Sequence, residues 1–414
     1  MKVAFIVEFP TQFEVPFYQY VAGQVKGERA KDFDSAQSDK GGVDSHFDSA
    51  QCDMAQCDKE KKEQRTKNKE VEDWHFHVIY NNTDQQDYHD FELGKKVGWG
   101  FNLYEGYTYF IADKNDIVNS VSAILEKGNY DYVILNGYKN SYAGLPELCK
   151  QKNIPIALRI DSVLYNLGPI KKFLKRIYLP FAYRKFDHFF AVGSETKRFL
   201  NWLGIKDERI NYFSYSVDED WFKETANDAE KIDALKKRLG IHNEKVLLSV
   251  AKFVPRESPW DILRAFEKLN DTGLALILVG DGEERKALEN YAGRMPHLKI
   301  VFTGYIPYQE LGYYYGLADI FIHAAKDEPW GVSVHEALAC GCTVITSDKV
   351  GSSKDLIVEG KNGFTYPFGN AVGLAQAIEA SLKIDRSEKN ITNRTILSEW
   401  GYPEMLSQIK SVLG

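Results

Sequence analysis

Two glutamates separated by seven residues, Glu328 and Glu336, are the side chains whose types and spacing first suggest chemistry. They lie in the stretch EPWGVSVHEALACG, which follows the apolar run DIFIHAA. This pattern predicts a buried strand, a short loop and a helix that begins near Val332 or Ser333. The amides at the start of such a helix, around Ser333 and Val334, favour an anion together with the helix dipole.

The two carboxylates lie on either side of this expected anion site. Glu336, one turn inside the helix, can accept two hydrogen bonds from a ribose diol, whereas Glu328 faces the group attached beyond the phosphates. A nucleoside diphosphate sugar carries its groups in that order. Alternatively, Glu336 is an ordinary solvated helix residue and Glu328 a capping acid. A glycosidase pair fits less well, because a helix start lies between the two carboxylates.

The whole chain limits the class of protein. Its 414 residues exceed what one core usually holds, so two domains of roughly 150 to 200 residues are expected. The formal net charge of −7 argues against a general nucleic-acid binder. The five cysteines suit neither a disulfide framework nor a zinc site. The stretch MKVAFIVEFP is too short for a signal or a membrane span, and we interpret it as the first buried strand of a cytoplasmic protein.

Short apolar runs alternate with helical patterns along most of the chain. Runs such as YDYVILNG, IPIALRID, EKVLLSVAKF and CTVITSD have a continuous rather than an alternating apolar pattern, which is typical of strands buried on both faces of a parallel sheet. Two such βα series, separated near residues 215–240, predict an α/β protein with two Rossmann-like domains. No G-x-G-x-x-G motif follows the first strand of either series, which disfavours a dinucleotide-linked oxidoreductase.

The segment 28–72 differs from the rest of the chain in composition. It repeats FDSAQ and AQCD and ends in a run of charged residues. Its few branched apolar residues cannot offset the loss of chain entropy on folding, so we predict a disordered insertion in the first domain. Its histidine and cysteine residues match no usual spacing of metal ligands.

Several stretches resemble glycosyltransferase family 4, whose members are retaining enzymes with the GT-B fold. The resemblance rests on the two spaced glutamates followed by ALACGCTVITSDKVGSSKDLI, and on SVAKFVPRESPWDILRAF, LILVGDGEER and VFTGYIPYQELGYYYGLADIFIHAAKDEPWG. In the first half, FPTQFEVPFYQY, WGFNLYEGY, RIDSVLYN and DHFFAVGSETKRFLNWLG look like bacterial members that build surface polysaccharides. The GT-B fold implies two Rossmann-like domains whose parallel sheets face each other across a cleft.

The resemblance also implies roles for individual residues. It places Glu328 on the hydroxyls of the donor sugar, Glu336 on the ribose, and Lys252 and Arg256 on the diphosphate. The other donor-binding positions that it marks are Trp330, Gly331, Val332, Ser333, Val334, Gly280, Gly304 and Tyr305. The chemistry agrees, because a departing nucleoside diphosphate carries negative charge that fixed cations and amides stabilise most strongly in the transition state.

On the acceptor side, the resemblance predicts Asn136, Tyr138 and Arg159, although VILNGYKNS lacks the histidine that the family usually has there. Either the leaving phosphate deprotonates the acceptor hydroxyl, or the relevant position lies elsewhere in the first domain. Glu257 stands where a lysine is common, which leaves Arg256 as the second cation. No aspartate pair resembles a metal-binding DxD motif, so we expect neither a metal nor another cofactor.

The expected activity is therefore transfer of a sugar, with retention, from a nucleotide-sugar donor to a glycan or lipid-linked acceptor in cell-surface polysaccharide biosynthesis. The predicted domains are residues 1–214 for the acceptor, 215–396 for the nucleotide sugar, and 397–414, a helix that returns to the first domain. A non-enzymatic nucleotide-sugar-binding scaffold and a sugar-nucleotide epimerase of the same fold remain alternatives.

One further stretch, GPIKKFLKRIYLPFAYRKFDHF, mixes lysine and arginine with large apolar residues. The mixture is typical of a helix resting on an anionic membrane surface, and equally of a core helix with a solvated basic face. The sequence leaves both open. We expect a cytoplasmic protein, with peripheral contact at the inner face of the membrane as one of the two interpretations.

Overall fold

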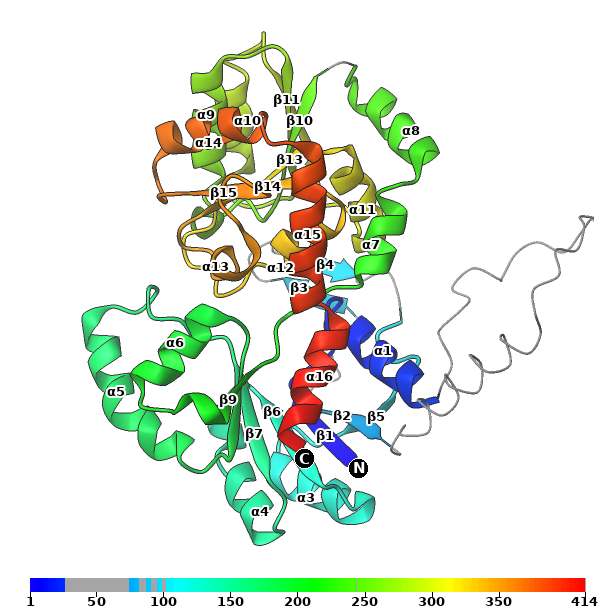
Figure 1. Ribbon diagram of the computed structural model, residues 1–414, viewed down its shortest axis with the longest axis vertical. Helices are drawn as coiled ribbons and strands as arrows, with labels where there is room; N and C mark the ends of the chain where they lie inside the picture. Colours follow the sequence, from blue (N-terminus) through cyan, green and yellow to red (C-terminus); the bar gives the residue numbers. More distant parts are fainter. Residues whose placement is uncertain (27–73, 82–86, 91–94, 99–101, 243, 414) are drawn as a thin grey trace, which may run out of the picture.

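The protein has two α/β parts, each built around a parallel sheet, in the computed structural model of Figure 1. The structure describes residues 1–26, 74–81, 87–90, 95–98, 102–242 and 244–413. The predicted insertion 28–72 lies outside the described residues. We call the part built on the first sheet the first domain and the part built on the second sheet the second domain.

The first sheet has seven strands in the order β5-β2-β1-β6-β7-β8-β9, and its neighbouring strands are parallel. Its strands are β1 (Lys2–Val7), β2 (His75–Tyr80), β5 (Thr108–Ile111), β6 (Tyr132–Asn136), β7 (Ile156–Ile160), β8 (His188–Ala191) and β9 (Ile210–Tyr212). Its helices are α1 (Val15–Lys26), α3 (Ile117–Gly128), α4 (Leu145–Gln151), α5 (Pro169–Tyr183) and α6 (Ser194–Trp202). A separate antiparallel pair consists of β3 (Asp87–Asp90) and β4 (Lys95–Gly98).

The second sheet has six parallel strands in the order β12-β11-β10-β13-β14-β15. Its strands are β10 (Lys245–Val250), β11 (Leu274–Val279), β12 (Lys299–Gly304), β13 (Ile320–His323), β14 (Thr343–Ser347) and β15 (Gly363–Tyr366). The helices around it are α7 (Glu219–Thr225), α8 (Ala229–Leu239), α9 (Pro259–Leu269), α10 (Arg285–Ala292), α11 (Tyr308–Leu317), α12 (Val332–Ala339), α13 (Ser353–Leu356) and α14 (Ala371–Ser381). Strands β11 and β14 are buried along their whole length, and β11 accordingly has an uninterrupted apolar sequence.

In both sheets, the order in which successive strands are added changes direction at the first strand. In the first sheet β1 lies between β2 and β6, and in the second sheet β10 lies between β11 and β13. Consecutive crossovers therefore leave in opposite directions at these two places. In open α/β sheets the crevice at the carboxyl end of such a switch point is where ligands bind. The predicted donor residues lie at the carboxyl ends of β10, β11, β12 and β13, and the predicted acceptor residues Asn136 and Tyr138 lie at the carboxyl end of β6.

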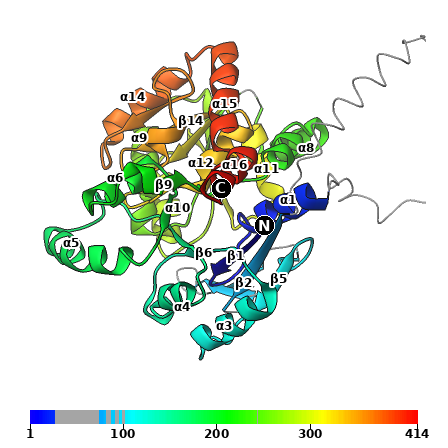
Figure 2. The ribbon, with the colours of Figure 1, turned by 60° about the horizontal axis from the view of Figure 1, so that its bottom comes forward.

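Two consecutive helices connect the domains on the side seen in Figure 1 and Figure 2. Helix α15 (Arg386–Trp400) packs on α12 of the second domain, and α16 (Tyr402–Leu413) packs on β9 and α1 of the first. The buried side chains of α16 that join the first domain's core, beside Phe17 and Phe213, are Tyr402, Met405, Leu406 and Ile409. The predicted boundary at residue 396 falls inside α15.

The structure does not support the acceptor-side role predicted for Arg159, because its side chain is only 1% exposed. Its guanidinium pairs with Glu14 at 2.6 Å and donates to the carbonyl oxygens of Phe213 (2.9 Å) and Ser214 (2.8 Å). It also lies 4.0 Å and 4.3 Å from the ring centroids of Phe213 and Tyr215. Arg159 therefore fixes the segment that leaves the first domain, and an acceptor cannot reach it.

Segments at the carboxyl ends of the two sheets are joined by direct hydrogen bonds. The hydroxyl of Tyr165, in the segment after β7, donates to the backbone oxygen of Glu328, after β13, at 2.6 Å. The amide of Ser194, at the start of α6, donates to Asp355 of α13 at 3.0 Å. Burial raises the pKa of Asp355 to about 6, although its bonds to Ser194 oppose the shift. The two predicted ligand-binding edges are thus adjacent.

We predict that Arg159→Leu lowers the free energy of unfolding by about 3 to 5 kcal/mol, since it leaves the Glu14 carboxylate buried without its partner. The measurement is the urea midpoint. Lys139→Leu, which removes the exposed ion pair with Glu8, is the matched control and should cost about 1 kcal/mol or less. The double variant Arg159→Leu/Glu14→Leu should be more stable than Arg159→Leu alone. Equal midpoints for Arg159→Leu and the control would contradict the structural role.

Candidate functional site

The predicted donor residues converge on the switch point of the second sheet. Lys252 and Arg256 lie in the segment that follows β10, and Glu328 lies in the segment that follows β13. The two segments are joined directly, because the amide of Lys326 donates to the backbone oxygen of Arg256 at 2.8 Å. Arg256 and His323 both lie close enough to Glu328 to lower the pKa of its carboxyl group, against the larger effect of burial.

The predicted glycine turn holds the backbone around Lys252 in place. Gly280 has φ +142, and a Cβ there would overlap the backbone oxygen of Ala251, so only glycine fits. The amide of Gly280 donates to Gly304 at 2.9 Å, and the amide of Phe253 donates to Asp281 at 2.9 Å. These contacts give Gly280 and Gly304 a positioning role next to the predicted phosphate site. Tyr305, directly after Gly304, remains 37% exposed.

Helix α12 begins at Val332, as predicted, and Gly331 precedes it in a left-handed conformation with φ +91. A Cβ on Gly331 would lie 3.0 Å from Val350 and 3.3 Å from both Glu328 and His323, so the helix start is closely surrounded. The amide of Val334 already donates to Gly331 at 3.0 Å. The amides of Val332 and Ser333 are therefore the members of the predicted group that suit an anion, because the first amides of a helix have no intrahelical acceptor.

Glu336 is not the solvated helix residue that the sequence left open as an alternative. It is only 6% exposed and accepts a hydrogen bond from the hydroxyl of Tyr315 at 2.7 Å. Burial raises its pKa to about 7, although the bond from Tyr315 opposes the shift. A buried carboxylate with one hydrogen-bond donor still has acceptor capacity for a further polar group.

Glu328 lies between the two domains, next to a second carboxylate. Burial, and then the negative charge of Glu257, raises the pKa of Glu328. Its carboxylate accepts the amide of Trp330 at 3.3 Å. Glu257 is 7% exposed and pairs with Arg256 at 3.1 Å. The predicted second cation, Arg256, thus shares its charge with a neighbouring acid.

Trp330, predicted to contact the donor, has a different position. Its side chain is 1% exposed and its indole donates to the backbone oxygen of Tyr215 at 2.8 Å. Its ring also fills the space where Gly193 of the first domain would carry a Cβ, and lies 5.2 Å from the ring of Trp400. Trp330 therefore packs between the domains and is closed off from a donor.

The predicted acceptor residues Asn136 and Tyr138 lie at the switch point of the first sheet. Tyr138 packs edge-on against Phe186, with ring centroids 5.7 Å apart. Close by, Lys139 after β6 forms an ion pair with Glu8 after β1. These side chains are at the predicted edge of the first domain, and their contact with an acceptor stays a prediction.

The sequence analysis did not predict two residues that lie at the candidate site, His323 and Tyr165. His323, the last residue of β13, is 5% exposed, and neither of its ring nitrogens has a hydrogen-bond partner among the described residues. Tyr165 reaches the Glu328 loop from the first domain. The position of His323 at the carboxyl end of a predicted strand was the available signal, whereas nothing local marks Tyr165 because its partner is distant in sequence.

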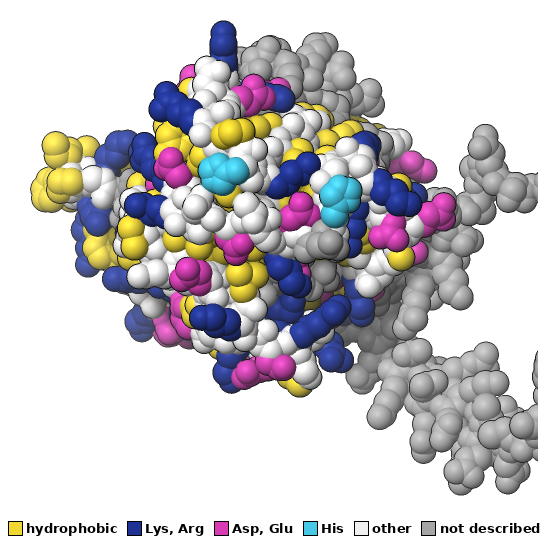
Figure 3. Space-filling model, turned by 90° about the horizontal axis from the view of Figure 1, so that it is seen from above, with side chains coloured by type: hydrophobic (Ala, Val, Ile, Leu, Met, Phe, Trp, Pro, Cys, Tyr) yellow, Lys and Arg dark blue, Asp and Glu magenta, His cyan; other side chains and the backbone are white. Residues whose placement is uncertain are grey.

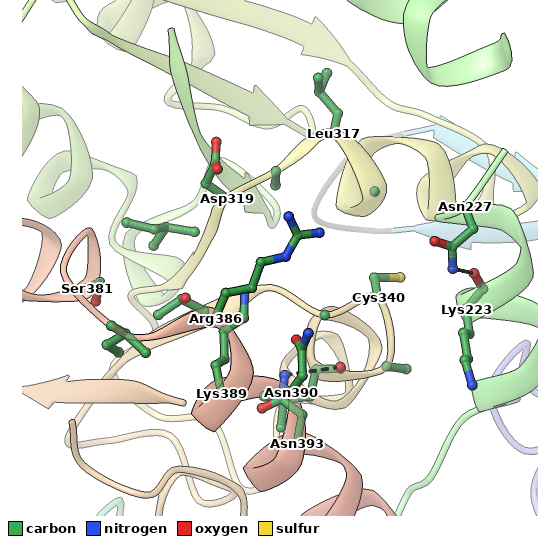
Figure 4. Close-up of a pocket in the computed structure, with 18 of the residues that line it drawn as sticks. Lys223, Asn227, Leu317, Asp319, Cys340, Ser381, Arg386, Lys389, Asn390 and Asn393 are labelled. Atoms are coloured by element: carbon green, nitrogen blue, oxygen red, sulfur yellow. Dashed lines mark hydrogen bonds between the residues drawn. The ribbon is translucent and has the colours of Figure 1, made fainter. Parts of the chain in front are cut away.

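A cavity of about 1040 Å³ lies elsewhere, at the opposite edge of the second sheet. Lys245, Ile320 and Thr343, the first residues of β10, β13 and β14, are among its lining residues. Figure 4 shows the side chain of Arg386 extending into it from α15, with Asp319 and Cys340 on other walls. It contains none of the predicted site residues. In the described part of the chain, no group of three or more His, Cys, Asp or Glu side chains could hold a metal ion.

Comparison with known proteins finds a family match that lies mainly in the second domain. Residues 231–397 match the family model described as glycosyl transferases group 1. The chain is 31% identical over 150 residues to the alpha-monoglucosyldiacylglycerol synthase of Acholeplasma laidlawii, a match that covers 35% of this chain and 37% of that protein. The matches to the first curated relatives span between 37% and 51% of those proteins.

Solved structures match over the whole chain. A glycosyltransferase from Rickettsia africae has a TM-score of 0.68 at 16% identity, covering 100% of this chain and 97% of that one. The Anabaena protein HepE, solved with UDP and glucose, has a TM-score of 0.67 at 14% identity. The match covers 100% of this chain and 99% of HepE. With the two parallel sheets, these likenesses confirm the predicted GT-B fold.

We predict that Glu336→Gln stabilises the protein at pH 8 but not at pH 5. Because the folded-state pKa is raised to about 7, folding favours the protonated acid, and this contribution is lost as pH rises through that value. Glutamine does not titrate, so the stability of the variant relative to the parent should increase by on the order of 2 to 3 kcal/mol between the two pH values.

The check is the melting temperature of both proteins from pH 5 to pH 8, with the exposed Glu399→Gln as control. The control should follow the parent at every pH. A constant difference between Glu336→Gln and the parent across the range would show that Glu336 is ionised throughout.

Proposed function

We propose that this chain, whose residues 231–397 match the glycosyl transferases group 1, is a retaining glycosyltransferase that uses a nucleotide-sugar donor. The observation that carries the proposal is the convergence of cations, helix amides, the buried Glu336 and the half-buried Glu328 at the switch point of the second sheet. The structure of HepE with UDP and glucose supports a donor of this kind.

Each group of the donor has a matching partner in the proposed site. The amides of Val332 and Ser333 and the cation of Lys252 would receive the diphosphate. Glu336 would accept hydrogen bonds from the ribose hydroxyls, and Glu328 from the hydroxyls of the sugar. His323, buried with two unsatisfied ring nitrogens, gives the sugar or phosphate a further hydrogen-bonding partner.

The transfer step follows from this arrangement. The bond between the anomeric carbon and the phosphate oxygen breaks, and its electron pair leaves with the nucleoside diphosphate. The acceptor oxygen forms the new bond on the same face of the sugar, and its proton passes to the departing phosphate oxygen. This route needs no histidine in the first domain. Lys252 and the α12 amides would stabilise the charge as it develops on the phosphate.

The acceptor is proposed as a hydroxyl of a lipid-linked molecule or a glycan, in the synthesis of cell-surface polysaccharide. The similarity to the alpha-monoglucosyldiacylglycerol synthase of Acholeplasma laidlawii favours a lipid-linked acceptor. Asn136 and Tyr138 would face this acceptor from the first domain. A non-catalytic donor-binding scaffold is the rival that the following experiment separates from a transferase.

We predict that Lys252→Ala lowers the single-turnover transfer rate by about a hundredfold, with a smaller loss of donor affinity, because its charge matters most as the phosphate departs. The donor is first identified by thermal stabilisation with a panel of nucleotide sugars, which should reach about 2.7 kcal/mol at 100 times the dissociation constant. The exposed Lys383→Ala serves as control and should match the parent.

Three results would count against this scheme. A parent that binds a nucleotide sugar but neither transfers nor hydrolyses it would be a scaffold. Equal rates for parent and Lys252→Ala would remove Lys252 from the mechanism. A product with the opposite anomeric configuration, determined by NMR, would exclude retention.

Transfer is also expected to proceed without a divalent metal, since Lys252 and the helix amides supply the positive charge that a metal provides in other sites. The rate after treatment with EDTA should therefore remain within about twofold of the untreated rate. Abolition by EDTA, with recovery on addition of Mg²⁺ or Mn²⁺, would contradict metal independence.

A further inference from the structure

Helix α5 (Pro169–Tyr183) carries a continuous stripe of large apolar side chains on its outer face. The stripe consists of Ile170 (75% exposed), Phe173 (66%), Leu174 (58%), Ile177 (52%), Tyr178 (60%) and Phe181 (61%). These residues follow one another at spacings of three, one, three, one and three positions, so they share a single helical face. A stripe of this kind normally faces the core, whereas here it faces outward.

The opposite face of α5 already joins the first domain. Ala182 and Tyr183 are buried in its core, and Leu179 packs against the same cluster. Lys175 lies on this inner side as well, with its ammonium 5.4 Å from the ring centroid of Phe199, and burial lowers its pKa. The sequence had left open a core helix with a solvated basic face. The structure shows the reverse, because the apolar side chains are the exposed ones.

Basic residues border the exposed stripe. At 100° per residue, Lys171 and Arg176 fall on opposite sides of it, and Arg184 lies beyond its carboxyl end with its guanidinium 5.4 Å from the ring centroid of Phe181. Figure 3 shows hydrophobic side chains beside Lys and Arg at the margin of the molecule where α5 lies in Figure 1. The whole chain has a net charge of −7, so this positive surface is a local feature.

We propose that the outer face of α5 binds the surface of an anionic phospholipid bilayer, with the stripe among the acyl chains and the basic border at the headgroups. In the described residues, no helix is long and apolar enough to cross a membrane. The helix therefore lies in the plane of the interface. A second copy of the chain fits less well, because a twofold contact through α5 would bring like-charged borders together.

This location brings the bilayer near the proposed donor site. Tyr165, which contacts the backbone of Glu328, lies only four residues before Pro169, where α5 begins. A lipid-linked hydroxyl would therefore reach the junction of the two domains from the membrane side. This last step rests on the proposed function, whereas the binding of α5 to lipid does not depend on it.

The test is flotation of the full chain with vesicles of phosphatidylcholine alone or of phosphatidylcholine with phosphatidylglycerol. We expect binding at least about tenfold stronger to the anionic vesicles, and weaker in high salt. The variant Phe173→Ser/Ile177→Ser/Phe181→Ser should lose at least about tenfold in the partition coefficient. Its melting temperature should stay unchanged because the three side chains are exposed. Ile391→Ser, at an apolar side chain that is 58% exposed on α15, is the matched control.

A second variant, Lys171→Glu/Arg184→Glu, keeps the stripe and reverses two border charges. It should abolish the preference for anionic vesicles. No binding to either vesicle, or unchanged binding by both variants, would overturn the proposal. So would a parent that forms dimers in sedimentation while the serine variant is monomeric, since a second copy would then cover the stripe. Failure of transfer with intact lipid binding would overturn only the proposed function.

Discussion

Both sheets are parallel throughout, and this constraint determines where every functional group of the protein can lie. In a parallel sheet all carboxyl ends meet at one edge, and a change in the direction of the crossovers opens a crevice there. This change of direction occurs at β1 in the first sheet and at β10 in the second. The contacts of Tyr165 with Glu328 and of Ser194 with Asp355 bring the two edges together. Residues distant in sequence then share one site.

Burial gives this site its electrostatic character. Glu328, Glu336 and Asp355 all have raised pKa values, and in each case burial is the main cause. Carboxylates that are costly to ionise gain from hydrogen-bond donors supplied by a ligand. A donor rich in hydroxyl groups would supply them. The pairing of Arg256 with Glu257 further limits the positive charge. Under the proposed function, this limit would favour release of the diphosphate product.

Patterns local in sequence predicted much of the fold, including the strand, loop and helix start that carry the proposed donor site. The continuous apolar runs predicted the buried parallel strands. The residues around Glu328 and Glu336 predicted a strand, a loop and a helix start, and the structure has them at the predicted positions. Long-range partners could not be predicted in this way. Arg159 is buried because Glu14, 145 positions away, pairs with it. Trp330 is buried by Gly193 of the first domain and by Tyr215 of the segment that leaves that domain. For α5, the sequence shows apolar and basic residues at helical spacing. Which face of the helix packs on the core depends on tertiary contacts that this spacing does not determine.

The last helix of the chain, α16, belongs to the core of the first domain, and this affects folding during synthesis. Tyr402, Met405, Leu406 and Ile409 complete the core beneath β1 and α1, yet ribosomes make them after both sheets. The domain made first therefore exposes apolar surface until nearly the whole of the second has emerged. At about 5 to 20 residues per second, that interval lasts some tens of seconds. Chaperones that bind nascent chains would meet their substrate here in the amino-terminal half.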